Sequence, residues 1–90
     1  MNIPSQFTLG GLVWKVVWRK RIKGKYGECV LHKQTIHLLS GLPPELTEQT
    51  FLHELCHAIH YAMGKNEHNE EFIDAFATML HQALTTAKYD

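Results

Sequence analysis

The period of the apolar residues changes near the middle of this 90-residue chain, and the change limits the folds open to it. Within residues 12–19, apolar side chains occupy every second position on one side, which is the pattern of a half-buried strand. After Pro44, apolar residues recur every three or four positions, which is the pattern of helices. The sequence therefore predicts an α+β fold in a single domain, residues 1–90.

The predicted elements divide the chain into a small sheet and two helices. We expect an antiparallel sheet over residues 7–39, with strands at 7–9, 12–19, 28–31 and 35–39. Two packed helices are expected over residues 44–63 and 69–86, the second capped by Asn66 or Asn69. The apolar stripe expected to bury the second helix consists of Phe72, Ile73, Phe76, Leu80, Ala83 and Leu84.

Composition excludes several classes of protein. Apolar residues make up 44% of the chain and charged residues 20%, values typical of a globular domain and unlike a disordered or collagen-like chain. No apolar run approaches the roughly 18 residues that a membrane span requires, so no membrane partner is expected. The first residues lack the features of a signal peptide, and we expect a cytoplasmic protein. Two cysteines, Cys29 and Cys56, are too few for a disulfide framework.

The helix predicted over residues 44–63 carries the segment His53-Glu54-Leu55-Cys56-His57, which has the form H-E-x-x-H. Residues four apart lie on one helix face about 6 Å apart, so His53 and His57 can bind the same tetrahedral Zn²⁺ ion. Glu54 points too far round the helix to be a ligand, but it can reach a water on the metal as a general base. His60 lies about 10.5 Å along the axis from His53, too far to share that ion, and is expected at the periphery.

A third ligand is expected from the second helix. Glu70 and Asp74 are four residues apart and share a face, so Glu70 can bind the metal while Asp74 accepts the outer N–H of a ligating histidine. Glu71 and His68 remain alternatives for the third ligand. The acids also have a simpler interpretation, which is favourable charge at a helix N-terminus.

These paired motifs resemble the gluzincin zinc peptidases. Asn69-Glu70-Glu71-Phe72-Ile73-Asp74 is similar to the thermolysin-type pattern N-E-x-x-x-D, in which the Glu is the third zinc ligand and the Asp supports a zinc-bound histidine. Residues 26–84 also resemble the small phage- and prophage-encoded minigluzincins and, more distantly, the ImmA/IrrE-type peptidases. Thermolysin has a further helical domain with a histidine that helps to stabilise the transition state, and we expect no counterpart of it within these residues.

The leading functional hypothesis is a zinc-dependent metallopeptidase with one Zn²⁺ per chain. Glu54 would take a proton from the attacking water and return it to the leaving amine. Tyr61, His60 and His68 are candidate donors to the oxyanion. The resemblance implies a protein or peptide substrate bound along the exposed edge of the sheet, expected at the strand 35–39. The alternative is a zinc-stabilised binding or regulatory module for a protein or nucleic-acid partner, with little or no turnover.

Charge is distributed unevenly along a chain whose net charge is zero. Residues 1–38 carry seven Lys and Arg against one Glu, a balance of +6, and residues 39–90 carry two Lys against eight acids, a balance of −6. Five of the cations lie between Arg19 and Lys25. No nucleic-acid-binding motif accompanies them, so a solvated loop is the simpler interpretation and a nucleic-acid partner is not expected.

Overall fold

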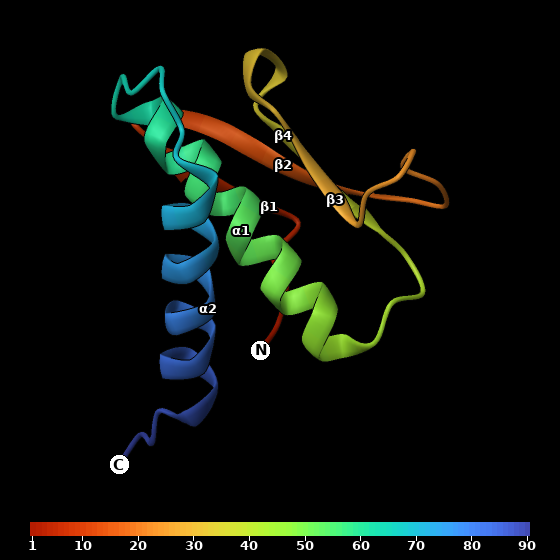
Figure 1. The fold of residues 1–90 in the computed structure, drawn as a ribbon, viewed down its shortest axis with the longest axis vertical. Coiled ribbons are helices and arrows are strands. Elements are labelled where there is room, and N and C mark those ends of the chain that lie inside the picture. Colours follow the sequence, from red (N-terminus) through yellow and green to blue (C-terminus); the bar gives the residue numbers. More distant parts are fainter.

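The computed structural model describes residues 1–90, and it confirms the α+β fold (Figure 1). In chain order the elements are β1 (Gln6–Leu9), β2 (Leu12–Arg19), β3 (Gly27–Val30), a 3₁₀ turn η1 (Leu31–Lys33), β4 (Thr35–Leu39), α1 (Pro44–Ala62) and α2 (Glu70–Thr86). Helix α1 lies against one face of the sheet, and α2 packs against α1. Neither helix combines the length and apolar character that a bilayer span requires.

The four strands form a mixed sheet in the order β1-β2-β4-β3, so the expected purely antiparallel sheet is wrong. β1 with β2 and β3 with β4 pair antiparallel, but β2 and β4 run parallel, with Val16 opposite Ile36 and Trp18 opposite Leu38. After β2 the chain crosses over and forms β3 at the edge of the sheet. It then turns back, and β4 fills the position between β2 and β3. Strand periodicity does not encode which strands become neighbours.

This order also corrects the expected position of the sheet edge. Residues 35–39 form β4, which is paired on both sides and offers no free edge to a peptide. The free edge on the side of α1 belongs to β3, whereas β1 forms the opposite edge.

The core lies between the sheet and α1. Its fully buried large side chains are Trp14, Ile36, Leu38, Leu52 and Ile73, and α1 adds Phe51 and Cys56. Helix α2 reaches this core through a narrow face, Ile73, Ala77 and His81. The broader apolar stripe expected for α2 is therefore only partly buried. Phe72 and Phe76 are 52% and 49% exposed, and they border an open groove together with Ile59 and Met63 of α1.

The helix ends follow local sequence signals. Pro44 occupies the first turn of α1, where a missing N–H costs nothing, and Gly64, with φ of 78°, follows the end of that helix. The side chain of Asn69 caps α2 by accepting a hydrogen bond from the Phe72 backbone N–H at 3.0 Å. Because this cap begins α2, Glu70 stands in its first turn and faces α1.

Candidate metal centre

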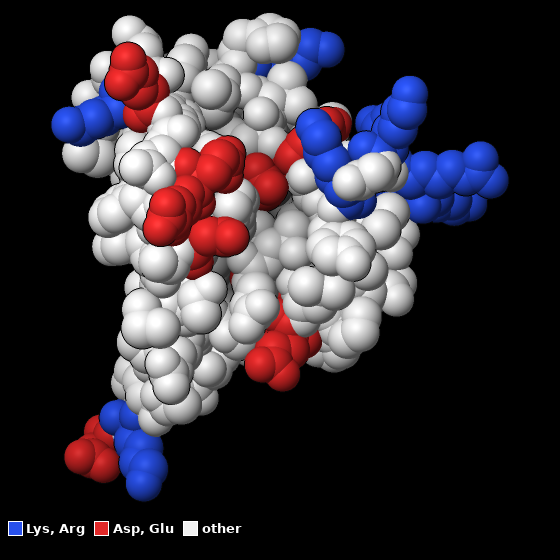
Figure 2. Space-filling view, in the orientation of Figure 1, with Lys and Arg blue, Asp and Glu red and all other residues white.

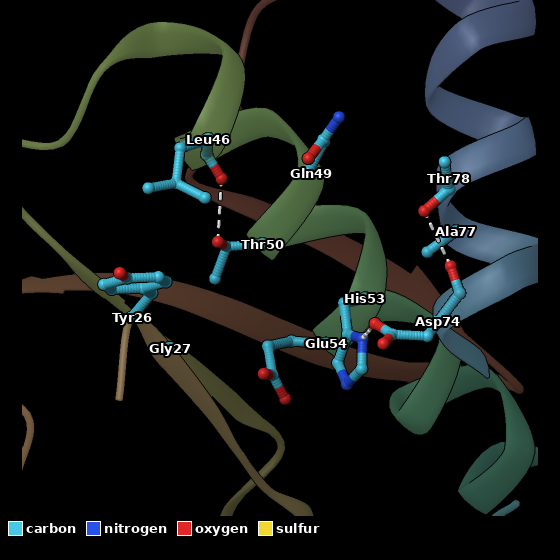
Figure 3. A pocket seen from close by; sticks show the side chains of 10 residues that line it. All are labelled: Tyr26, Gly27, Leu46, Gln49, Thr50, His53, Glu54, Asp74, Ala77 and Thr78. Atoms are coloured by element: carbon cyan, nitrogen blue, oxygen red, sulfur yellow. Dashed lines mark hydrogen bonds and ion pairs between the residues drawn. The ribbon is translucent and has the colours of Figure 1, made fainter. Parts of the chain in front are cut away.

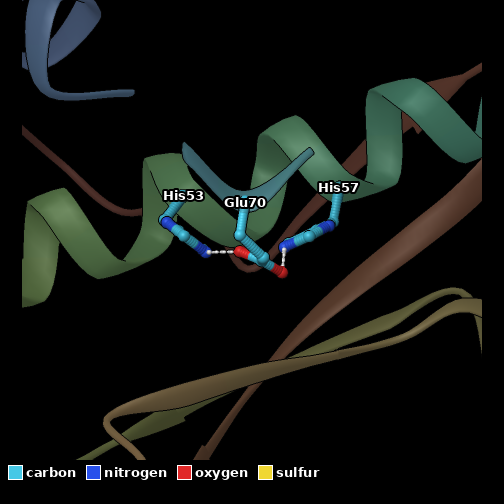
Figure 4. Close-up of side chains that lie close together, drawn as sticks. All are labelled: His53, His57 and Glu70. Atoms are coloured by element: carbon cyan, nitrogen blue, oxygen red, sulfur yellow. Dashed lines mark ion pairs between the residues drawn. The ribbon is translucent and has the colours of Figure 1, made fainter. Parts of the chain in front are cut away.

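Three side chains from two helices meet beside the β3 edge (Figure 4). His53 Nε2 lies 3.2 Å from Glu70 Oε2, and His57 Nε2 lies 3.0 Å from Glu70 Oε1. One ligand atom from each residue falls within 4.8 Å of the others. The structure thus brings together the three residues expected to hold a metal, while their role as ligands stays a prediction.

The outer nitrogens of both histidines have hydrogen-bond partners. His53 Nδ1 lies 3.0 Å from Asp74 Oδ1, which is the contact expected of Asp74. Since a carboxylate only accepts, Nδ1 donates to Asp74, and Nε2 on the other side of the ring is the nitrogen turned toward Glu70. The neutral Nε2-acceptor form is the one that a metal binds, and a partner on the other nitrogen is typical of ligating histidines.

His68 holds His57 in the same way, a role that the sequence did not reveal. The two Nδ1 atoms lie 2.7 Å apart, and His68 Nε2 lies 3.1 Å from the Lys65 carbonyl oxygen. The carbonyl must accept from His68 Nε2–H, which leaves His68 Nδ1 to accept from His57 Nδ1–H. The chain of bonds therefore turns the other ring nitrogen of His57, Nε2, toward Glu70. His68 stands in the loop between the helices, where no spacing rule predicts such a contact.

Glu54 lies beside this cluster, and its pKa is raised from 4.5 to about 7. Burial is the main cause, and the negative charges of Glu70 and Glu28 add to it. His53 and Lys25 act in the opposite direction. Burial also lowers the pKa of His57, which favours its neutral form. A carboxyl with a pKa near neutrality can both accept and release a proton at physiological pH.

A cleft runs along β3 on both sides of Glu54. One part, about 280 Å³, is lined by residues of α1 and α2 and by the start of β3 with the residue before it, and these include Tyr26, Gly27, Gln49 and Thr50 (Figure 3). The other, about 410 Å³, is lined by residues that include Lys25, Cys29, His57 and Glu70. His53, Glu54 and Gly27 line both parts.

Gly27 allows the strand to lie this close to the helix. A Cβ atom at Gly27 would come within 2.7 Å of the Thr50 Cγ2 atom and 3.1 Å of the His37 carbonyl oxygen. The free edge of β3 therefore borders the same cleft as Glu54. The cleft-lining residues Tyr26, Gly27, Gln49 and Thr50 were not singled out from the sequence, because nothing local marks them as neighbours of the motif.

The other candidates lie away from the cleft. Glu71 lines a separate shallow hollow with Phe72, away from the two ligand histidines. His60 donates from Nδ1 to the Cys56 carbonyl oxygen at 2.7 Å. Tyr61 packs edge-on against Trp14, with ring centroids 6.2 Å apart. None of His60, Tyr61 and His68 lines either part of the cleft, and their role as donors to an oxyanion stays a prediction.

The fold consists of a small sheet with a free edge beside an H-E-x-x-H helix, and a second helix supplies a further carboxylate. This arrangement defines a domain of the zincin-like metallopeptidase class. The chain belongs to the SprT-like family, whose sequence model matches residues 5–89 and which is part of that superfamily. No curated protein and no solved structure is significantly similar to the chain.

Proposed function

We propose that this protein is a zinc-dependent peptidase of gluzincin type, in which His53, His57 and Glu70 hold one Zn²⁺ and Glu54 is the general base. The observation that carries the proposal is the convergence of two imidazole Nε2 atoms on one carboxylate, with both Nδ1 atoms already partnered. Membership of a zincin-like family supports it.

The donor set fits zinc. Two neutral imidazoles and one carboxylate are the ligands of many catalytic zinc sites, which keep a further position open. Zinc at these residues would supply Lewis-acid chemistry, lowering the pKa of a water and polarising a peptide carbonyl. Asp74 and His68 would hold the two imidazoles in the orientation that binding requires.

Glu54 would carry the proton during hydrolysis. Its carboxylate would accept a proton from the attacking water and pass it to the amine that leaves when the peptide bond breaks. Burial suits it to this task, because the raised pKa places both protonation states within reach near neutral pH.

The substrate would lie extended along the free edge of β3. Backbone groups of Gly27–Val30 on that edge are not used within the sheet, and an added peptide strand would pair with them. The scissile carbonyl would then come beside Glu54, which lies in the middle of the cleft.

The first test is metal content, measured by mass spectrometry on the purified protein. We expect one zinc per chain in the wild type, with strong loss in His57→Ala and Glu70→Ala. Glu71→Ala is the matched control, since it removes a neighbouring carboxylate that faces a different hollow. Zinc retained in Glu70→Ala and lost in Glu71→Ala would contradict the ligand assignment.

The second test is hydrolysis of a library of internally quenched peptides by zinc-loaded protein. Glu54→Gln should keep the metal and lose about 10²- to 10⁴-fold in rate, the usual contribution of a general base. Zinc binding without any hydrolysis in the wild type would favour the alternative, a zinc-stabilised binding module.

A further inference from the structure

Helix α2 has a second apolar face, which the chain itself leaves exposed. The face that packs against α1 consists of Ile73, Ala77 and His81. The second face, the outer stripe, consists of Phe72, Phe76, Met79 and Ala83, and all four residues are exposed. Their spacing of four, three and four residues draws one line along the helix, and it is the spacing by which two helices pack on each other.

The outer stripe continues into an apolar groove at the start of α2. The groove measures about 250 Å³, and Phe72 and Phe76 line it together with Ile59 and Met63 of α1. Met79 and Met63 are 60% and 65% exposed. Stripe and groove together expose about 500 Å² of apolar surface, an area at which a patch on a small protein is commonly a binding site.

The outer stripe is separate from the metal centre. Successive residues of a helix are rotated by about 100°, which places Phe72 and Phe76 on the opposite side of α2 from Glu70 and Asp74. A partner bound to the stripe would therefore leave the cleft open.

Charge along α2 is confined to its ends. Residues 75–87 contain no Lys, Arg, Asp or Glu, and Lys88 and Asp90 follow the helix. The acids of the amino-terminal end, including the loop before it, are Glu67, Glu70, Glu71 and Asp74. Figure 2 shows acidic side chains over the upper part of α2 and a mixed pair of charges at its lower end, with no charged group between them on this face.

This distribution favours one orientation of a second copy of the same helix. Parallel pairing would bring the four acids of each copy together. Antiparallel pairing brings the acidic end of each copy beside the end that carries Lys88, and it also places the two helix dipoles in opposite directions. The outer stripe is thus complementary to itself when the second helix is reversed.

We propose that two copies of this protein pair through the outer stripe, with their α2 helices antiparallel and the two-fold axis beside Met79. Full overlap of the stripe, from Phe72 to Thr86, puts its middle residue, Met79, on the axis. Because homodimer interfaces are about two-thirds apolar, about 500 Å² of apolar surface corresponds to about 800 Å² per copy, the size of a specific interface.

The first test is sedimentation velocity of the purified protein. Between about 1 and 500 µM the mass should rise from that of one chain, 10.4 kDa, toward twice that value, with a Kd of about 10–100 µM. A protein that remains a single chain at the highest concentration would overturn the proposal.

Charge exchange at the axis identifies the surface. Met79→Glu places two carboxylates against each other and should raise the Kd by about 100-fold or more, and Met79→Lys should do the same. An equimolar mixture of the two variants should associate again, because opposite charges then meet, and misfolded variants could not give this result. Thr85→Glu is the matched control, since it adds the same charge to the opposite side of α2 and should associate like the wild type.

Disulfide formation tests the orientation. Under mild oxidation Met79→Cys should form a cross-linked dimer, whereas Thr86→Cys should not, because antiparallel pairing holds the two copies of residue 86 about 20 Å apart. The wild type is the control for Cys29 and Cys56. Association that persists in Met79→Glu, a mixture that stays monomeric, or cross-linking of Thr86→Cys equal to that of Met79→Cys would each overturn the proposal.

The pairing can fail without affecting the proposed peptidase. Met79→Glu should bind zinc like the wild type, because the outer stripe lies away from the metal centre. A monomeric wild type that binds zinc and hydrolyses peptides would overturn the dimer alone. A dimer without zinc would support the pairing and contradict the peptidase.

Discussion

The two helices bury histidines on one side of their contact and expose phenylalanines on the other. The His53 and His57 side chains are 23% and 14% exposed, whereas Phe72 and Phe76 are 52% and 49% exposed. On the apolar side a groove of about 250 Å³ opens between these phenylalanines, Ile59 and Met63. Hydropathy alone would predict buried phenylalanines and exposed histidines.

The difference shows what allows a polar group to be buried in a small domain. Every buried side-chain polar atom has a hydrogen-bond partner, so little free energy is lost when the imidazoles leave water. The phenylalanines need no partner, and they remain exposed because the narrow face of α2 already provides the contact with α1. Burial in this domain follows hydrogen-bonding partners and helix orientation as much as apolar character.

The first prediction compares two neighbouring residues of α2. Ile73 is fully buried and Phe72 is half exposed, so Ile73→Ala should lower the free energy of unfolding by about 2–5 kcal/mol. Phe72→Ala, the control, should cost less than about 1 kcal/mol despite removing a larger side chain. Urea denaturation measures both, and equal losses would mean that the apolar groove belongs to the core.

The second prediction concerns the carboxyl on the polar side. Burial raises the pKa of Glu54 from 4.5 to about 7, so the folded, metal-free protein holds a proton that the unfolded chain has released. The stability of the metal-free protein should therefore fall as pH rises from about 4.5 to about 7. Glu54→Gln removes that dependence and should be more stable than the wild type by about 1–3 kcal/mol at pH 8, and equally stable at pH 4.

Urea denaturation of both metal-free proteins across this pH range is the measurement. A wild type that is as stable as Glu54→Gln at pH 8 would mean that Glu54 is well solvated. The same substitution is expected to slow hydrolysis by about 10²- to 10⁴-fold, so a gain in stability together with this loss of activity would show that the buried carboxyl is maintained for chemistry.

The third prediction tests the hydrogen bond from His57 to His68. His68→Ala should weaken zinc binding by about 10- to 100-fold, the usual effect of removing the partner of a ligating histidine. His68→Gln should recover part of the affinity, because its amide oxygen can accept the same hydrogen bond. Competition with a fluorescent zinc chelator gives the affinities, with the exposed His32→Ala as control. An unchanged zinc affinity in His68→Ala would mean that His57 is held in place by α1 and does not need the hydrogen bond to His68.

The smallest effect is expected at a buried histidine outside the cleft. His81 Nε2 lies 2.8 Å from Glu48 Oε1, and this hydrogen bond lowers the pKa of Glu48 below its usual 4.5. Because the pKa of this carboxyl is lower in the folded protein, it stabilises the fold at pH values above its usual pKa. This stabilisation is lost as the pH falls through the lowered pKa. Acid unfolding monitored by circular dichroism should therefore be less steep in Glu48→Gln than in the wild type. Glu45→Gln, at an exposed carboxyl on the same helix, should unfold like the wild type.

Several features of this protein follow from its sequence because they depend on contacts within one or two helical turns. The bounds of both helices were predicted to within one residue, since Pro44, Gly64 and Asn69 act on the backbone next to them. The stacking of His53 and His57 follows from a spacing of four on a helix. The placement of Glu70 and Asp74 on one face of α2 follows from the same spacing.

Only the tertiary structure decided which parts of the chain border that motif. The parallel pairing of β2 with β4 moved the free edge from residues 35–39 to β3, and it brought Lys25 and Gly27 to the cleft. The contact between His57 and His68 depends on how the loop after α1 turns back, which no periodicity records. The spacing of residues decides which face of a helix or strand each side chain lies on. Which other element packs against that face depends on the path of the connecting loops, and the residues of these loops carry no regular pattern.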